Sequence, residues 1–159
     1  MGIELICVTV PLPSSKLSPN ASRVHYREKA SLIKKQREET RLVALEAAYK
    51  YDQKEPITSA IVQIIRFNRS IRRTDPDNLI AQLKSTFDGI TDAGVWVDDL
   101  DVVYLPPIQK KSAANPRVEL WIRQSPGDTR EMRERYFPGL EIVLDMVQPK
   151  LELQNQKPF

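Results

Sequence analysis

The chain has 159 residues and a formal net charge of +3, and its 41% hydrophobic and 28% charged content suits one globular domain and argues against disorder. One cysteine and one histidine, Cys7 and His25, exclude an internal disulfide and a zinc site of Cys and His ligands. The apolar run Ile3 to Val10 is too short for a signal peptide or a membrane span, so we expect a cytoplasmic protein without membrane contact.

The first half of the chain predicts two strands and a long helix. Glu4 to Val10 is short and β-branched, and we expect it to pair with Ile57 to Phe67. Residues 11–26 hold three prolines and four serines, which predicts a long loop. Apolar positions then recur with a helical period from Glu28 to Tyr51. Ile57 to Phe67 is nearly continuous in Ile and Val, as expected for a central strand covered on both faces.

The second half predicts one more main helix and two more strands. The helix runs from Pro76 to about Ala93, and the strands span Asp101 to Leu105 and Arg117 to Arg123. Together these elements favour an α+β fold with a small mixed sheet of about four strands and two main helices.

The C-terminal part is expected to add little to this domain. A short charged helix is predicted over residues 128–136 and an apolar segment over 140–143. We assign residues 1–148 to a single domain and 149–159 to a poorly ordered tail.

Charge is distributed unevenly along the chain. Residues 75–101 contain seven aspartates against one lysine, a formal charge of −6 that favours cation binding. Residues 16–41 contain eight basic side chains against three acidic ones. This basic stretch suits a phosphate-facing surface, although a solvated helix face with internal ion pairs would give the same pattern.

Three carboxylates of the acidic stretch are expected to converge. Asp75 precedes Pro76, which suits the first helical position, so Asp75 is a predicted N-cap; this role alone explains the motif without a function. The extended segment after Gly94 ends at Asp98 and Asp99, one of which can face Asp75 and Asp77. Three oxygen ligands with room for water and phosphate suit a magnesium site of the kind that nucleases use.

Lys84 is the single base of this stretch. On a continuous helix it shares a face with Asp77, separated from it by the small Ala81, and helical side chains lean toward the N-terminus. Its ammonium could therefore extend toward the carboxylates and stabilise charge on a phosphate during transfer.

These residues resemble the RusA-like Holliday junction resolvases, many of them encoded by phages. The resemblance covers most of residues 5–123, and it rests on Arg72-Arg73-Thr-Asp75-Pro-Asp77-Asn78-Leu79, Lys84, Asp88-Gly-Ile, Trp96-Val-Asp98-Asp99 and the opening loop with Leu17 to Tyr26. One position departs from the family pattern. Many members place the lysine three residues after the asparagine, where this chain has Ala81, and we transfer its role to Lys84.

The resemblance implies a homodimeric endonuclease of DNA recombination and repair that uses magnesium, or manganese in its place, and nicks a four-way DNA junction symmetrically. It implies Asp75, Asp77 and Asp99 as catalytic metal ligands, Asp98 as an alternative ligand and Lys84 as the catalytic lysine. Phosphate contacts are expected from polar and basic residues: Lys16, Asn20, Arg23, Arg66, Arg69, Arg72, Arg73, Lys110 and Lys111. A phage-encoded member would act in the cytoplasm of the bacterial host.

Two alternatives stay open. The protein could bind branched DNA without cleaving it, and the displaced lysine is the reason to consider this. The aspartates could instead only cap a helix and bind structural calcium. Cleavage of a labelled four-way junction in magnesium distinguishes these alternatives from the nuclease.

Overall fold

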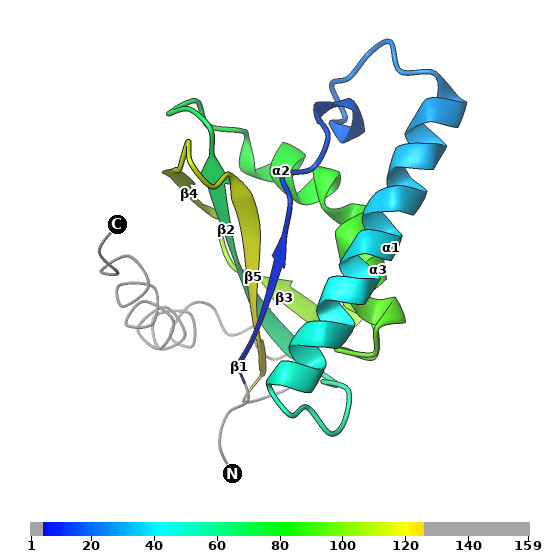
Figure 1. The fold of residues 1–159 in the computed structure, drawn as a ribbon, viewed down its shortest axis with the longest axis vertical. Coiled ribbons are helices and arrows are strands. Elements are labelled where there is room, and N and C mark those ends of the chain that lie inside the picture. Colours follow the sequence, from blue (N-terminus) through cyan, green and yellow to red (C-terminus); the bar gives the residue numbers. More distant parts are fainter. Residues whose placement is uncertain (1–4, 126–159) are drawn as a thin grey trace.

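A five-stranded sheet with helices on one face forms the fold of residues 5–125, the part of the chain that the computed structural model describes (Figure 1). The strands are β1 (Leu5–Val10), β2 (Ala60–Asn68), β3 (Val102–Tyr104), β4 (Ile108–Lys111) and β5 (Arg117–Gln124). The helices are α1 (Tyr26–Lys50), α2 (Pro76–Gln82) and α3 (Lys84–Asp92), with short 3-10 helices η1 (Ser15–Leu17) and η2 (Asp99–Asp101). The predicted α+β class is confirmed, with five strands in place of about four.

The sheet is mixed, and β2 lies at its centre. Its order is β1-β5-β2-β3, and β4 also pairs with β2. β5 is antiparallel to both β1 and β2, whereas β3 and β4 run parallel to β2, one after the other along its other edge. The predicted pairing of the first strand with Ile57 to Phe67 is wrong, because β5 lies between them. Alternation of apolar residues identifies a strand but carries no information on which distant strand lies next to it.

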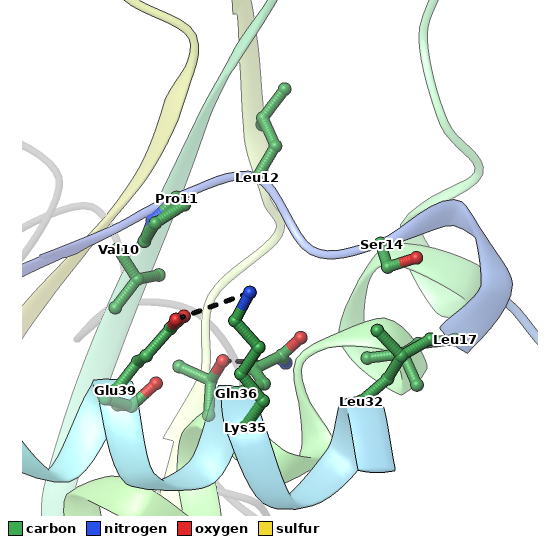
Figure 2. A pocket seen from close by; sticks show the side chains of 11 residues that line it. Val10, Pro11, Leu12, Ser14, Leu17, Leu32, Lys35, Gln36 and Glu39 are labelled. Atoms are coloured by element: carbon green, nitrogen blue, oxygen red, sulfur yellow. Dashed lines mark hydrogen bonds and ion pairs between the residues drawn. The ribbon is translucent and has the colours of Figure 1, made fainter. Parts of the chain in front are cut away.

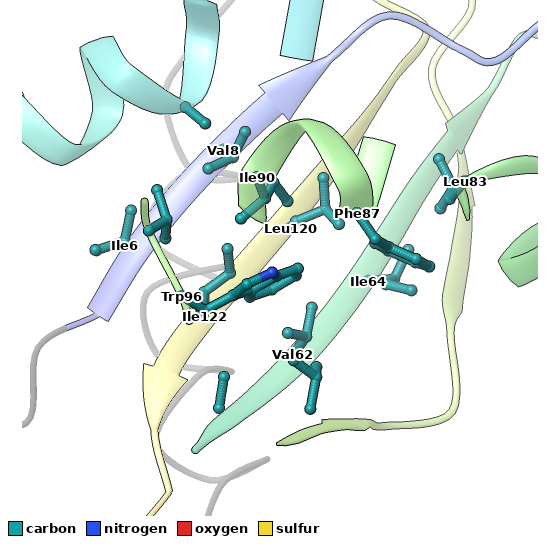
Figure 3. Close-up of a cluster of buried hydrophobic side chains, with 14 of the residues drawn as sticks. Ile6, Val8, Val62, Ile64, Leu83, Phe87, Ile90, Trp96, Leu120 and Ile122 are labelled. Atoms are coloured by element: carbon teal, nitrogen blue, oxygen red, sulfur yellow. The ribbon is translucent and has the colours of Figure 1, made fainter. Parts of the chain in front are cut away.

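The main core lies between the sheet and the helices (Figure 3). Val62 and Ile64 of β2 face α3, while Ile61 and Ile65 belong to a second apolar cluster on the opposite face. All four side chains are at most 1% exposed, which confirms that β2 is buried on both faces. Burial of each such side chain stabilises the fold by about 1.5–3 kcal/mol.

Helix α1 covers the sheet and packs against α3 (Figure 1). It begins two residues before the predicted start, because the Nδ1 atom of His25 accepts a hydrogen bond from the N–H of Arg27 at 3.2 Å and caps the helix. Arg37 of α1 also donates from Nη2 to the Oδ1 atom of Asp92 in α3 at 2.7 Å. Gly89 lies directly under the backbone of α1 at this crossing.

The predicted continuous helix from Pro76 to Ala93 is wrong, because it is interrupted at Leu83. This residue has φ −94° and ψ 4°, and its N–H bonds to the carbonyl of Ile80 three residues earlier. Gln36 of α1 donates from Nε2 to the carbonyl oxygen of Gln82 and to Oγ1 of Thr86, both at 2.9 Å. A side chain 46 residues away in sequence from Gln82 thus satisfies a carbonyl at the break, and helical periodicity cannot reveal it.

The predicted strands near residues 101 and 117 are confirmed as β3 and β5, while β4 is an additional strand that follows Pro106-Pro107. The predicted helix over 128–136, the segment over 140–143 and the tail lie outside the described residues. None of the helices within residues 5–125 combines the length and the apolar character needed to cross a bilayer.

Candidate active site

Asp75 and Asp77 lie at the start of α2, and both are exposed. The Oδ1 atom of Asp75 accepts a hydrogen bond from the N–H of Asp77 at 3.0 Å, and Pro76 occupies the first turn. The predicted N-cap is therefore confirmed. Both carboxylates also lie at the positive end of the helix dipole, where negative charge is stabilised.

Lys84 of α3 forms ion pairs with two carboxylates, one on α3 itself and one on η2. Its Nζ atom lies 2.5 Å from Oδ2 of Asp99 and 2.9 Å from Oδ1 of Asp88. These hydrogen bonds, from Asp99 first and then Asp88, raise the pKa of Lys84 above its ordinary value. The same bond from Lys84 is the main reason that the pKa of Asp99 is lowered. Lys84 therefore reaches one of the three predicted ligands.

Asp98 and Asp99 have different roles in this turn. Asp98 has an extended backbone and caps η2, since its Oδ1 accepts from the N–H of Leu100 at 3.1 Å. Asp99 is the first residue of η2, and its side chain is 24% exposed. Burial, together with the charges of Asp99 and Asp88, raises the pKa of the neighbouring Tyr104 phenol.

The carboxylates have the hard oxygen donors that magnesium prefers. Within residues 5–125, however, no group of three or more Asp, Glu, His or Cys side chains lies close enough together to hold a metal ion. Asp75 accepts from a backbone N–H and Asp99 from Lys84, so in this conformation the predicted ligands do not fit a metal ion as a set.

A cavity of about 660 Å³ opens beside Asp75, between the start of α2 and the segment that leads into β4. It is lined by Arg73, Thr74, Asp75, Pro76, Pro107, Ile108 and Gln109. Basic residues lie on the two segments that form its walls. Arg69, Arg72 and Arg73 belong to the exposed loop between β2 and α2, and Lys110 and Lys111 lie at the exposed end of β4.

The other predicted phosphate contacts lie elsewhere. Arg66 is half-buried under α2, where its Nη1 donates to Oε1 of Gln82 at 3.3 Å and burial lowers its pKa. Lys16 forms an ion pair with Glu28. Asn20 and Arg23 are exposed in the loop before α1.

Two further cavities adjoin α1. One of about 400 Å³ places Leu17 and Pro19 of the first loop beside Lys84 and Asp88, so this loop reaches the predicted lysine. The other, of about 310 Å³, lies between that loop and α1 and contains the ion pair of Lys35 with Glu39 (Figure 2). None of the predicted site residues lines this second cavity.

No family model matches the chain. A protein of Xylella fastidiosa (strain Temecula1 / ATCC 700964) is 34% identical over 107 residues, which span 67% of this chain and 68% of that protein. The chain belongs to the family of this Xylella protein. The relative is described as "Uncharacterized protein", so membership of its family adds no activity to the chemistry of the side chains.

Two residues of the site were not predicted from the sequence. Asp88 shares Lys84 with Asp99, and its spacing of four residues from Lys84 is a signal that could have identified it. Gln109 bonds to the backbone of Thr74, which directly precedes Asp75. No signal identifies Gln109, because its contact depends on how β4 pairs with β2.

Proposed function

We propose that this protein is a magnesium-dependent, structure-specific DNA endonuclease that resolves four-way junctions by paired nicks, in the manner of the RusA-like resolvases that its sequence resembles. Manganese would substitute for magnesium. The observation that carries the proposal is the cavity at Asp75, because its walls come from segments that also hold five exposed cations. A metal-dependent nuclease requires a carboxylate that can hold the metal, next to a surface that binds the phosphates of the DNA backbone.

In this proposal the basic residues hold the DNA backbone and the carboxylates act on one phosphodiester. By the resemblance, Asp75, Asp77 and Asp99 would hold the metal, with Asp98 as the alternative ligand. Because these side chains form no metal-binding group in the described conformation, metal binding would require them to rearrange. Lys84 would donate hydrogen bonds to the phosphate as negative charge develops on it. The ion pair with Asp99 keeps the lysine next to one predicted ligand.

Junction cleavage by the purified full chain tests the function directly. A four-way junction labelled separately on each strand is incubated with magnesium, with manganese or with EDTA. We expect symmetric nicks in two opposing strands with either metal and intact strands in EDTA. Binding without nicks in both metals would refute the nuclease and support the branched-DNA-binding alternative, which the engagement of Asp99 by Lys84 also favours.

Asp75→Asn and Asp99→Asn test the assigned residues. Asparagine caps helices as well as aspartate, so Asp75→Asn keeps the start of α2, and cleavage is expected to fall on the order of 10² or more with junction binding retained. Asp101→Asn removes the same charge from the end of η2 and is the matched control. If the Asp101→Asn protein lost as much cleavage activity as the other two variants, the loss would reflect the change in net charge, and the assignment of Asp75 and Asp99 as ligands would be wrong.

We also propose that the active form is a homodimer, because two symmetric nicks require two sites related by a two-fold axis. Light scattering coupled to size-exclusion chromatography measures the mass. A monomeric mass both with and without a bound junction would contradict this part of the proposal.

A further inference from the structure

We infer that Gln109 is a positioning residue for Asp75, which it holds in place through the backbone of Thr74. The inference rests on the proposed function, because it explains how one predicted catalytic carboxylate is oriented. Gln109 contacts neither DNA nor metal in this account. It acts on the residue that precedes the N-cap of α2.

The geometry is that of a two-way amide clamp. The Nε2 atom of Gln109 donates to the carbonyl oxygen of Thr74 at 2.6 Å, and its Oε1 atom accepts from the N–H of Thr74 at 2.9 Å. One side-chain amide thus satisfies both backbone groups of one residue. Because both bonds point to the same residue, they fix its orientation as well as its position.

The clamp is anchored in the sheet. Gln109 lies on β4 opposite Arg66 of β2, in a parallel pairing that runs from Ile65 to Asn68. The Nδ2 atom of Asn68 lies 3.4 Å from Oε1 of Gln109, and the N–H of Ser112 donates to the carbonyl of Asn68 at 2.8 Å. The start and the end of the arginine-bearing loop, Asn68 and Thr74, therefore meet at the same glutamine.

The Asp75 carboxylate is held by the N–H of Asp77, and in our inference the clamp fixes the backbone from which it extends. Asp75 follows Thr74 directly, and both residues line the 660 Å³ cavity together with Gln109. Without the clamp, the exposed loop can rotate about the backbone of Thr74 and move the carboxylate out of line with the cavity. A displacement of about 1 Å at a reacting group can reduce the rate on the order of 10².

The test replaces Gln109 by a side chain of equal length that cannot form either bond. Gln109→Met is expected to slow single-turnover cleavage of a four-way junction at least about tenfold. The dissociation constant of the junction, measured in EDTA by fluorescence anisotropy, should change less than about twofold, because phosphate contacts dominate binding. Amide hydrogen exchange of Thr74, measured by NMR, should become faster. Gln109→Glu keeps the acceptor for the Thr74 N–H and loses the donor to the Thr74 carbonyl. In this variant the Thr74 amide should still exchange slowly, while the cleavage rate should still fall.

Gln53→Met is the matched control, because the Gln53 side chain also makes two hydrogen bonds to the backbone, by donating to the carbonyls of Glu55 and Val95, away from the cavity. It should lower the melting temperature similarly and keep the cleavage rate. Equal cleavage by the two Met variants, unchanged exchange at Thr74, or a loss of binding as large as the loss of cleavage would each overturn the inference. If the wild-type protein does not cleave, the proposed function fails, while exchange at Thr74 still tests the clamp.

Discussion

Lys84 has both a proposed catalytic role and defined contacts in the structure. It forms ion pairs with Asp99 at 2.5 Å and Asp88 at 2.9 Å, and its own side chain is 62% exposed. In this exposed position the pairs contribute little to folding, since exposed ion pairs stabilise proteins by about 0–1 kcal/mol. Their effect is on placement, because they keep an ammonium group between α3 and η2.

Substitution of Lys84 separates its chemical role from its structural one. Lys84→Ala is expected to lower the cleavage rate on the order of 10², since one donor to the developing charge is removed, and to leave junction binding and melting temperature nearly unchanged. Lys54→Ala is the control, because Lys54 is an exposed lysine that also forms an ion pair, with Asp52. A Lys84→Ala protein that cleaves at the wild-type rate would remove this lysine from the site.

The residues that sequence predicts well are those whose roles are local. Asp75 as N-cap and a helix end near Ala93 follow from neighbouring residues, and the structure confirms both, with α3 ending at Asp92. The pair of Lys84 with Asp99 and the clamp of Gln109 on Thr74 join residues 15 and 35 positions apart. Such contacts depend on the tertiary arrangement, which local patterns do not contain.

Helices α1 and α3 approach each other closely at Gly89. A Cβ atom added to Gly89 of α3 would lie 2.5 Å from the carbonyl oxygen of Arg37 and 2.8 Å from Cβ of Thr40. Because the first of these atoms belongs to the backbone of α1, no side-chain rotation can relieve the overlap. The two helices can therefore approach this closely only with glycine at position 89.

Gly89→Ala is expected to destabilise the protein. Overpacking costs about 1–3 kcal/mol, and the better helix propensity of alanine offsets up to about 1 kcal/mol of it. Urea unfolding followed by tryptophan fluorescence measures the change. The comparison is Gly94→Asn, where the added side chain meets open space and asparagine tolerates the positive φ. Equal stabilities of the Gly89→Ala and wild-type proteins would mean that α1 and α3 can separate freely.

The positions of the helices and strands along the chain were predicted more reliably than which of these elements lie next to each other. The apolar runs located β1, β2, β3 and β5 because alternation and β-branching are local properties. The short β4 was missed, since three of the four residues in Ile108–Lys111 are polar and the segment follows two prolines. The break at Leu83 was missed because its stabilising partner, Gln36, belongs to another helix.

At the scale of the whole molecule, charge is segregated. Exposed cations of the loop after β2 and of β4 lie at one end of the sheet edge, beside the carboxylate at Asp75. Arginine and lysine in this arrangement favour a polyanion over a small neutral ligand. Because the net charge is only +3, a preference for a polyanion would have to come from this local grouping.

Salt dependence measures this grouping. The affinity for a four-way junction in EDTA is expected to fall more than tenfold between about 50 and 200 mM salt, because bound phosphates release counterions. The double variant Arg72→Ala/Arg73→Ala should reduce the slope of log affinity against log salt by about 1–2, since each contact contributes about 0.9. Lys54→Ala should leave the slope unchanged. A slope near zero for the wild-type protein would exclude the phosphate-binding surface.

The interruption at Leu83 has a consequence for how the length of α2 can vary. In an unbroken helix, each added residue rotates everything after it by about 100°. Here α3 has contacts of its own, through buried Leu83 and the bond from Gln36 to Thr86, so residues gained or lost within α2 need not turn α3. Lys84 lies one turn later than the lysine of the RusA-like sequences that this chain resembles, and this arrangement would let it keep its aspartate partners. We therefore expect α2 to tolerate insertions and deletions.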